Sequence, residues 1–141
     1  MWALSSDWQQ RLRRWRELCV RLVTDDRKAR GIKLLREWLS PSQLAQFDTG
    51  KYFDVIGCHT GKRYRIRYAS SMNVIEIDDL GRPKAGWCFI PDCYLVPGDI
   101  MLAQKIALEL FESNALKVAH HVPPRDGTFA ADVYTGGRYR R

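Results

Sequence analysis

The sequence predicts an α+β fold: an N-terminal helical hairpin, a four-stranded antiparallel meander, a C-terminal helix packed on the sheet, and a flexible tail. Apolar residues recur with the helical period of 3.6 up to about residue 50, alternate with the strand period of two from residue 52, and return to a helical pattern at 100–119. The 141 residues, 45% of them hydrophobic, suffice for one compact core. We therefore divide the chain into a basic helical segment (1–50), an α+β core (51–121) and a flexible basic tail (122–141).

The first 50 residues predict three helices. One apolar stripe of period 3.6 contains Trp8, Leu12, Trp15, Leu18, Cys19 and Leu22. Thr24 is the expected N-cap of a second helix, and the two helices are expected to pack as a hairpin. The stripe of that second helix contains Ile32, Leu35, Trp38 and Leu39. Ser40, Pro41 and Gln43 predict a capping-box start for a short third helix through about Phe47.

The middle of the chain predicts the sheet and the helix that covers it. Four segments alternate apolar and polar residues between turns: "YFDVIG", "RYRIRY", "MNVIEID" and "GWCFIP". The helix expected at 99–119 is apolar around well over half of its circumference, so it is expected to be mostly buried on one sheet face. The residues expected to be buried together are Trp87, Phe89, Ile66, Tyr64, Val55, Phe53, Ile106 and Leu110. Residues 122–141 show no period and contain two adjacent prolines, which predicts a mobile tail.

The net charge of +7 favours anionic partners but says nothing about the fold. Lys and Arg outnumber Asp and Glu by 10 to 5 in residues 1–40 and by 4 to 2 in residues 122–141, whereas residues 41–121 hold nine of each. The excess positive charge thus belongs to the N-terminal segment and the tail. No apolar run is long enough for a membrane span and the N-terminus lacks a signal-peptide pattern, so we expect a cytoplasmic protein that does not insert into a membrane.

Three groups of arginines are candidate nucleic-acid-binding residues. The first helix offers Arg13, Arg14, Arg16 and Arg21, the second strand offers Arg63, Arg65 and Arg67, and the tail offers Arg138, Arg140 and Arg141. The strand group has two interpretations. Asp54 and Glu76 on neighbouring strands would neutralise it and leave an ordinary solvated sheet face. An open face, extended by Lys62, Arg82 and Lys84, would instead bind phosphates.

Enzymatic and metal-binding patterns are weak in this sequence. It has no glycine-rich phosphate loop, no H-E-x-x-H and no G-x-S-x-G, so we expect no enzymatic activity and no cofactor. A zinc site drawn from Cys58, His59, Cys88 and Cys93 is an alternative to reduced thiols, but it lacks a C-x₂-C knuckle. Whether these cysteines bind a metal stays open at this stage.

Five segments carry a resemblance. The stretches "REWLSPSQLAQF", "YFDVIGCHTGKRYRIR", "SMNV", "CFIP" and "GDIMLAQKIALE" are similar to a small uncharacterised bacterial domain family with this order of motifs. The resemblance covers roughly residues 36–110. It implies no substrate, cofactor or catalytic residue, and the basic first helix and the tail lie outside it.

Two functional classes follow from the sequence. The first is a nonenzymatic module that contacts nucleic-acid phosphates with little sequence selectivity, chiefly through the first helix and the tail. The second is a protein-interaction or regulatory adaptor that docks through its Trp-rich helices or its tail on a protein partner or on another copy of itself.

Overall fold

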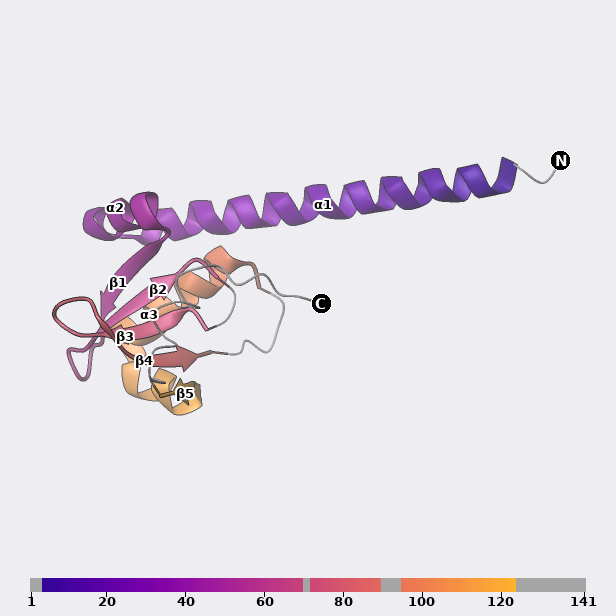
Figure 1. The fold of residues 1–141 in the computed structure, drawn as a ribbon. Helices are drawn as coiled ribbons and strands as arrows, with labels where there is room; N and C mark the ends of the chain where they lie inside the picture. The colour runs from indigo at the N-terminus through magenta and orange to yellow at the C-terminus, as the bar shows by residue number, and fades with distance from the viewer. Residues whose placement is uncertain (1–3, 70–71, 90–94, 124–141) are drawn as a thin grey trace.

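The computed structural model describes residues 4–69, 72–89 and 95–123, with side chains described from residue 9 onward. Its elements, in chain order, are α1 (Leu4–Trp38), α2 (Pro41–Gly50), β1 (Tyr52–Ile56), β2 (Arg63–Arg67), β3 (Val74–Ile77), β4 (Pro83–Cys88), α3 (Pro97–Val118) and β5 (His120–Val122). The α+β class is therefore confirmed. Figure 1 shows the sheet and α3 gathered into one body, with the far end of α1 extending beyond it.

The predicted helical hairpin is wrong, because α1 is a single helix of 35 residues. Thr24, expected to cap a second helix, lies inside α1 and its Oγ1 donates a hydrogen bond to the backbone carbonyl of Val20 at 2.8 Å. No glycine or proline stands between residues 20 and 30 to stop the helix. The change in the apolar pattern near Thr24 therefore marks a change in which face is apolar, and the backbone continues through it.

The sheet is an antiparallel meander, as predicted, with the strand order β1-β2-β3-β4-β5. Tyr64 of β2 stands between Val55 of β1 and Glu76 of β3, so these three side chains share one face. The predicted number of four strands is wrong, since His120–Val122 adds a fifth strand beside β4. Three residues are too few to show a period of two, and the sequence signal of β5 is hidden between a helix and a proline pair. The predicted mobile tail, 122–141, begins too early, since Val122 belongs to β5. Residues 124–141 of that tail lie outside the described residues.

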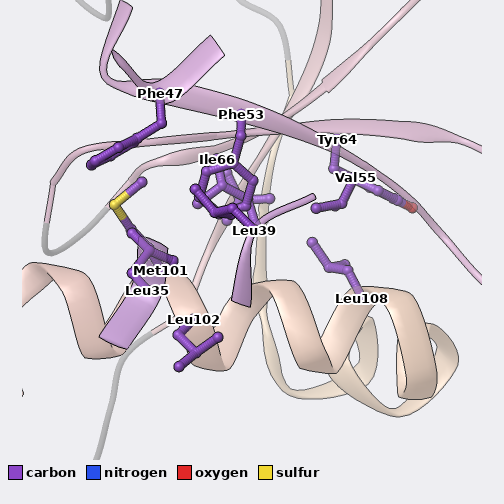
Figure 2. Packing of buried hydrophobic residues seen from close by; sticks show 11 residues of the cluster. Leu35, Leu39, Phe47, Phe53, Val55, Tyr64, Ile66, Met101, Leu102 and Leu108 are labelled. Carbon is purple, nitrogen blue, oxygen red and sulfur yellow. The ribbon is translucent and has the colours of Figure 1, made fainter. Parts of the chain in front are cut away.

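The core lies between the sheet and α3 and is closed by α1 and α2. Figure 2 shows Leu108 of α3 pointing toward Val55 and Tyr64, and Met101 pointing toward Phe47 of α2. Of the predicted core, Phe53, Val55, Tyr64 and Ile66 are fully buried, and Trp87, Phe89 and Ile106 pack against the cluster at its margin. Leu110 was predicted to be buried, but 63% of it is exposed. Only one side of a helix can face the sheet, and Leu110 lies about 200° around the axis of α3 from the buried Leu108, so it falls on the outer side.

Helix α2 begins and docks as its sequence predicts. The Ser40 side chain accepts a hydrogen bond from the Gln43 backbone and the Gln43 side chain accepts one from the Ser40 backbone, which is the predicted capping box. Gln43 Nε2 also donates to the carbonyl of Asp54, and the Asp54 amide donates to Gln46 Oε1, both at 2.9 Å. Because β1 is an edge strand, the two glutamines satisfy backbone groups that a further strand would otherwise pair with.

Glycines let α1 and α3 cross closely. A Cβ added to Gly98 of α3 would collide with the backbone of Gly31, and one added to Gly31 would collide with the Val96 side chain. Both glycines are buried, and Leu35, one turn further along α1, has no exposed surface. The carboxyl-terminal third of α1 is thus fixed to the body by backbone contact.

Candidate interaction site

The amino-terminal part of α1 carries large apolar side chains that no described residue covers. We call residues 4–26 the arm; Figure 1 shows this indigo end of α1 projecting beyond the sheet and α3. The arm stripe consists of Leu12, Trp15, Leu18, Cys19, Leu22 and Val23. Between 38% and 63% of each of its five large hydrophobic residues is exposed, with Trp15 at the upper end, and Cys19 is half-buried. Trp8, predicted in the same stripe, lies outside the residues whose side chains are described.

The arm stripe faces away from the body. A helix turns by about 100° per residue, which places the mean direction of the arm stripe roughly 160° around the axis from Leu35 and Leu39. Leu35 and Leu39 point into the core. The body therefore cannot cover the arm stripe while α1 stays continuous, and covering it requires another molecule or a segment outside the described residues.

The predicted arginines of the first helix lie on the rest of the arm's circumference. Arg13, Arg14, Arg16 and Arg21 are all exposed. Among the described residues, none of these four arginines has an acidic partner within ion-pair distance. The arm thus has an apolar face and a basic face, with Glu17 the one acidic residue between positions 9 and 24.

The strand arginines are engaged within the sheet. Arg63 and Arg65 both pair with Asp54 on β1, at 3.1 Å and 2.8 Å, and Asp54 is largely buried. The guanidinium of Arg65 also lies over the ring of Tyr52, 4.2 Å from its centroid. Arg67 has interaction partners as well. Asp54 is therefore an ion-pair partner of Arg63 and Arg65, as one interpretation of the sequence expected, and its single carboxylate offsets one of their two charges.

Glu76, the second expected partner, does not lie on the arginine face. It shares the core face with Tyr64 and forms its ion pair with Lys62, at 3.2 Å. Of the other residues proposed at the margin of a basic platform, Arg82 pairs with Asp78 at 2.7 Å and Lys84 is exposed. Arg138, Arg140 and Arg141 lie outside the described residues.

The sequence did not single out Glu112, the most deeply buried charged residue among those described. Its Oε2 accepts hydrogen bonds from the amides of His59 and Thr60 at 2.7 and 2.9 Å, and its Oε1 accepts from Thr60 Oγ1 and the Tyr64 hydroxyl at 2.5 and 2.7 Å. Burial acts to raise the pKa of this carboxyl, but the donors from Thr60, Tyr64 and His59 outweigh it and lower the pKa to about 2. Burial, together with the Glu112 contact, raises the pKa of the Tyr64 hydroxyl.

Glu112 is a structural anchor between α3 and the loop that joins β1 to β2. The helix is distorted at Phe111, whose φ of −138° and ψ of 36° are not helical, and the carbonyl of Leu108 accepts from the Cys58 amide. Gly57 leaves room for the carboxylate, because a Cβ there would overlap it. With four donors bound, the carboxylate is occupied. The sequence held one clue to this burial. Glu112 lies four residues after Leu108 and three before Ala115, so all three fall on the same buried side of α3.

Neither a metal site nor a membrane span is found in the described segments. No group of three or more His, Cys, Asp or Glu side chains gathers there closely enough to hold a metal ion. Cys58 and Cys88 are free thiols, and Cys93 lies outside the described residues. No described helix combines the length and the hydrophobicity needed to cross a bilayer.

Among the hollows lined by described residues, two lie open on the body surface. One, of about 450 Å³, lies beside α2 and β1 and includes Gln43, Asp54 and Glu109 in its lining; Gln43 bonds both to Glu109 and to the Asp54 backbone. The other, of about 290 Å³, lies where Arg27 and Arg30 of α1 approach Asp99 of α3.

Comparison with known protein families, curated proteins and solved structures finds no match for this chain. The resemblance to a bacterial domain family stays a prediction.

Proposed function

We propose that this protein is a nonenzymatic interaction module that docks on a protein partner through the arm stripe. A single observation carries the proposal: the arm stripe is exposed and points away from the only body that the described chain offers. Scattered exposed leucines are ordinary, but a continuous row of Leu, Trp and Val on a projecting helix is typical of surfaces that bind proteins.

The way such a helix binds follows from its geometry. An amphipathic helix buries its apolar face in a groove or against another helix, with anchors at spacings of three and four residues. Leu12, Trp15, Cys19 and Leu22 have these spacings. Trp15 is the expected main anchor, because tryptophan contributes large contact areas and is enriched among residues that dominate binding energy.

Two single substitutions on the arm test this proposal. Leu22→Lys changes the arm stripe, whereas Val20→Lys makes the same change two residues away, outside it. The two residues are similarly exposed, at 61% and 65%, so both variants should fold equally well. In a nuclease-treated lysate at moderate salt, we expect the unchanged chain and Val20→Lys to capture the same polypeptide and Leu22→Lys to lose it. Equal capture by both variants would contradict the proposal.

The basic face of the arm supports a second candidate function, contact with nucleic-acid phosphates. Arg13, Arg14, Arg16 and Arg21 are exposed without a described acidic partner, whereas Arg63 and Arg65 share Asp54. This contrast supports the prediction that the arm contributes more to such binding than the strand arginines do. The apolar and basic faces lie on different sides of the arm, and of the four arginines only Arg16 borders the arm stripe. The two functions therefore use largely separate side chains.

Salt separates the two functions. Each phosphate contact contributes about 0.7 to 0.9 to the slope of log K against log salt, depending on whether the nucleic acid is single- or double-stranded. With DNA and RNA oligonucleotides, we expect the triple variant Arg13→Ala, Arg14→Ala, Arg16→Ala to reduce this slope by about two to three. The triple variant Arg63→Ala, Arg65→Ala, Arg67→Ala is the comparison for the sheet. Loss of binding by the sheet variant alone would place the site on β2. If neither the unchanged chain nor any variant binds the oligonucleotides, protein docking is left as the function.

A further inference from the structure

We propose that the arm pairs with the arm of a second copy of this chain, in an antiparallel arrangement centred near Glu17. This inference rests on the proposed function and names its partner. The two copies would form a short two-helix seam, with each body on the outer side of the pair. Its specific contact is Trp15 of one copy against Cys19 of the other.

The spacing of the arm stripe fits a two-helix seam. Leu12, Trp15, Cys19 and Leu22 are separated by three, four and three residues, which places them at alternating a and d positions of a heptad. Leu18 and Val23 flank this row on its two sides and widen the apolar surface. Asp26 stands at the next a position and ends the row on the side of the body.

Side-chain size favours the antiparallel orientation. Antiparallel helices centred at residue 17 bring Leu12 opposite Leu22 of the second copy and Trp15 opposite Cys19. Every layer then has similar width, since the largest side chain meets the smallest. A parallel pair in register would place Trp15 against Trp15 and Cys19 against Cys19, so an overfilled layer would adjoin an underfilled one.

Charge favours the same orientation. In a parallel pair, Arg11 would lie beside Arg16 of the second copy on both sides of the seam, and the two Asp26 side chains would share a layer. In the antiparallel pair, Arg11 of each copy lies beside Asp25 of the other copy. One flank of the seam therefore carries two such contacts, one at each end. The remaining like-charge contact is a single Arg16 pair at the centre. The antiparallel pair thus has one like-charge contact where the parallel pair has three, and it gains two contacts between opposite charges.

The position of the body leaves the seam accessible. Because the arm stripe points roughly 160° away from Leu35 and Leu39, the second helix approaches from the side where the body is not. Figure 1 shows the free length of the arm beyond the body, which is the length that the second arm would cover. In the antiparallel arrangement the two bodies lie near opposite ends of the pair.

Sedimentation equilibrium of the purified full chain tests the assembly. We expect a reversible monomer–dimer equilibrium, in which Leu22→Lys raises the dissociation constant by roughly 100-fold and Val20→Lys changes it by less than about threefold. Both variants should keep the thermal midpoint of the monomer, because neither residue belongs to the core. A wild-type chain that stays monomeric at every concentration, or equal effects of the two variants, would overturn the proposal.

Disulfide cross-linking tests the orientation. In a Cys19→Ser background, Leu12→Cys and Leu22→Cys chains are purified separately and then oxidised alone or mixed. We expect the mixture to give a disulfide between positions 12 and 22, mapped by mass spectrometry, and neither chain alone to give a homodimer through its new cysteine. A disulfide between two copies of position 22 would show a parallel pair and overturn the assignment.

The outcomes separate this inference from the proposed function. If the chain is monomeric but Leu22→Lys loses a captured polypeptide that Val20→Lys retains, then the arm binds a different protein. Self-pairing is then wrong and the proposed function stands. If the chain is monomeric and both variants capture the same polypeptides, both proposals are wrong.

Discussion

The two ends of α1 have the same kind of sequence and opposite environments. Both carry apolar residues at helical spacing, yet Leu35 is fully buried while 61% of Leu22 is exposed. The carboxyl-terminal third meets the body through Gly31 and Leu35, whereas the large hydrophobic residues of the arm stripe are exposed. An amphipathic stripe therefore does not by itself show what covers it, and the direction of the apolar face decides whether its own chain can do so.

The largest expected contrast comes from truncating one leucine in each region. Leu35→Ala should lower the free energy of unfolding by about 2 to 5 kcal/mol, because it leaves a cavity between α1, the sheet and α3. Leu22→Ala should change it by no more than about 0.5 kcal/mol in the monomer. Urea denaturation at a protein concentration low enough to keep the chain monomeric measures both. Similar losses for the two variants would show that the arm stripe is also covered by its own chain.

A second contrast compares two glutamates. Glu112→Gln replaces one acceptor oxygen by an amide group among four buried donors, so it should cost about 2 to 4 kcal/mol of unfolding free energy. Glu17→Gln makes the same change on the exposed arm and should stay within about 0.5 kcal/mol. If the two variants were equally stable, Glu112 would not hold the β1–β2 loop to α3. Both are measured by chemical denaturation at neutral pH.

Acid should weaken the body through the same carboxylate. The pKa of Glu112 is about 2 in the folded chain and is lowered from an ordinary value of 4.5, so the unfolded chain binds a proton first as the pH falls. The stability from Glu112 is therefore fully present above about pH 4.5 and is lost progressively as the pH falls toward 2. Thermal unfolding of the unchanged chain and of Glu112→Gln between these values should show a flatter pH dependence for the variant. Parallel curves would contradict this assignment.

Local features of the fold were predictable and long-range ones were not. Ser40 and Gln43 lie three residues apart, so the capping box was readable, and so were the strand alternation and the meander. The sequence did not show that Gln43 also covers the β1 edge, or that Asn73 and Gln104 exchange two buried hydrogen bonds of 2.8 Å across 31 residues. The first pairing exists only after α2 docks on β1, and the second only after the sheet meets α3.

The same division holds for the arginines of the candidate site: their position on a strand face was predictable, and whether they are paired was not. Alternation placed Arg63 and Arg65 on one face of β2. The register of β1 and β2 sets Asp54 directly opposite Arg65 and diagonal to Arg63, and both arginines pair with it. The exposure of the arm stripe could not be predicted, because the change of apolar face near Thr24 looked like the end of a helix. Only the continuous backbone shows that the two stripes point in nearly opposite directions.

The smallest expected effect concerns Thr24, where the arm meets the docked part of α1. In a continuous helix Thr24 is an interior residue, and alanine has the higher helix propensity by up to about 0.7 kcal/mol. Thr24→Ala should therefore leave the helical circular dichroism signal at 222 nm unchanged or slightly stronger. If Thr24 were instead the N-cap of a second helix, its side chain would stabilise that helix by about 0.5 to 2 kcal/mol, and Thr24→Ala would lower the signal at 222 nm.

Spin labels at positions 13 and 33, in a chain whose four native cysteines are replaced by serine, measure the geometry of α1 directly. With labelled chains diluted into unlabelled ones, a continuous helix separates the two backbone positions by about 30 Å, since each residue adds 1.5 Å. A markedly shorter distance in the unchanged sequence would restore the hairpin, and the two stripes would then cover each other instead of facing apart.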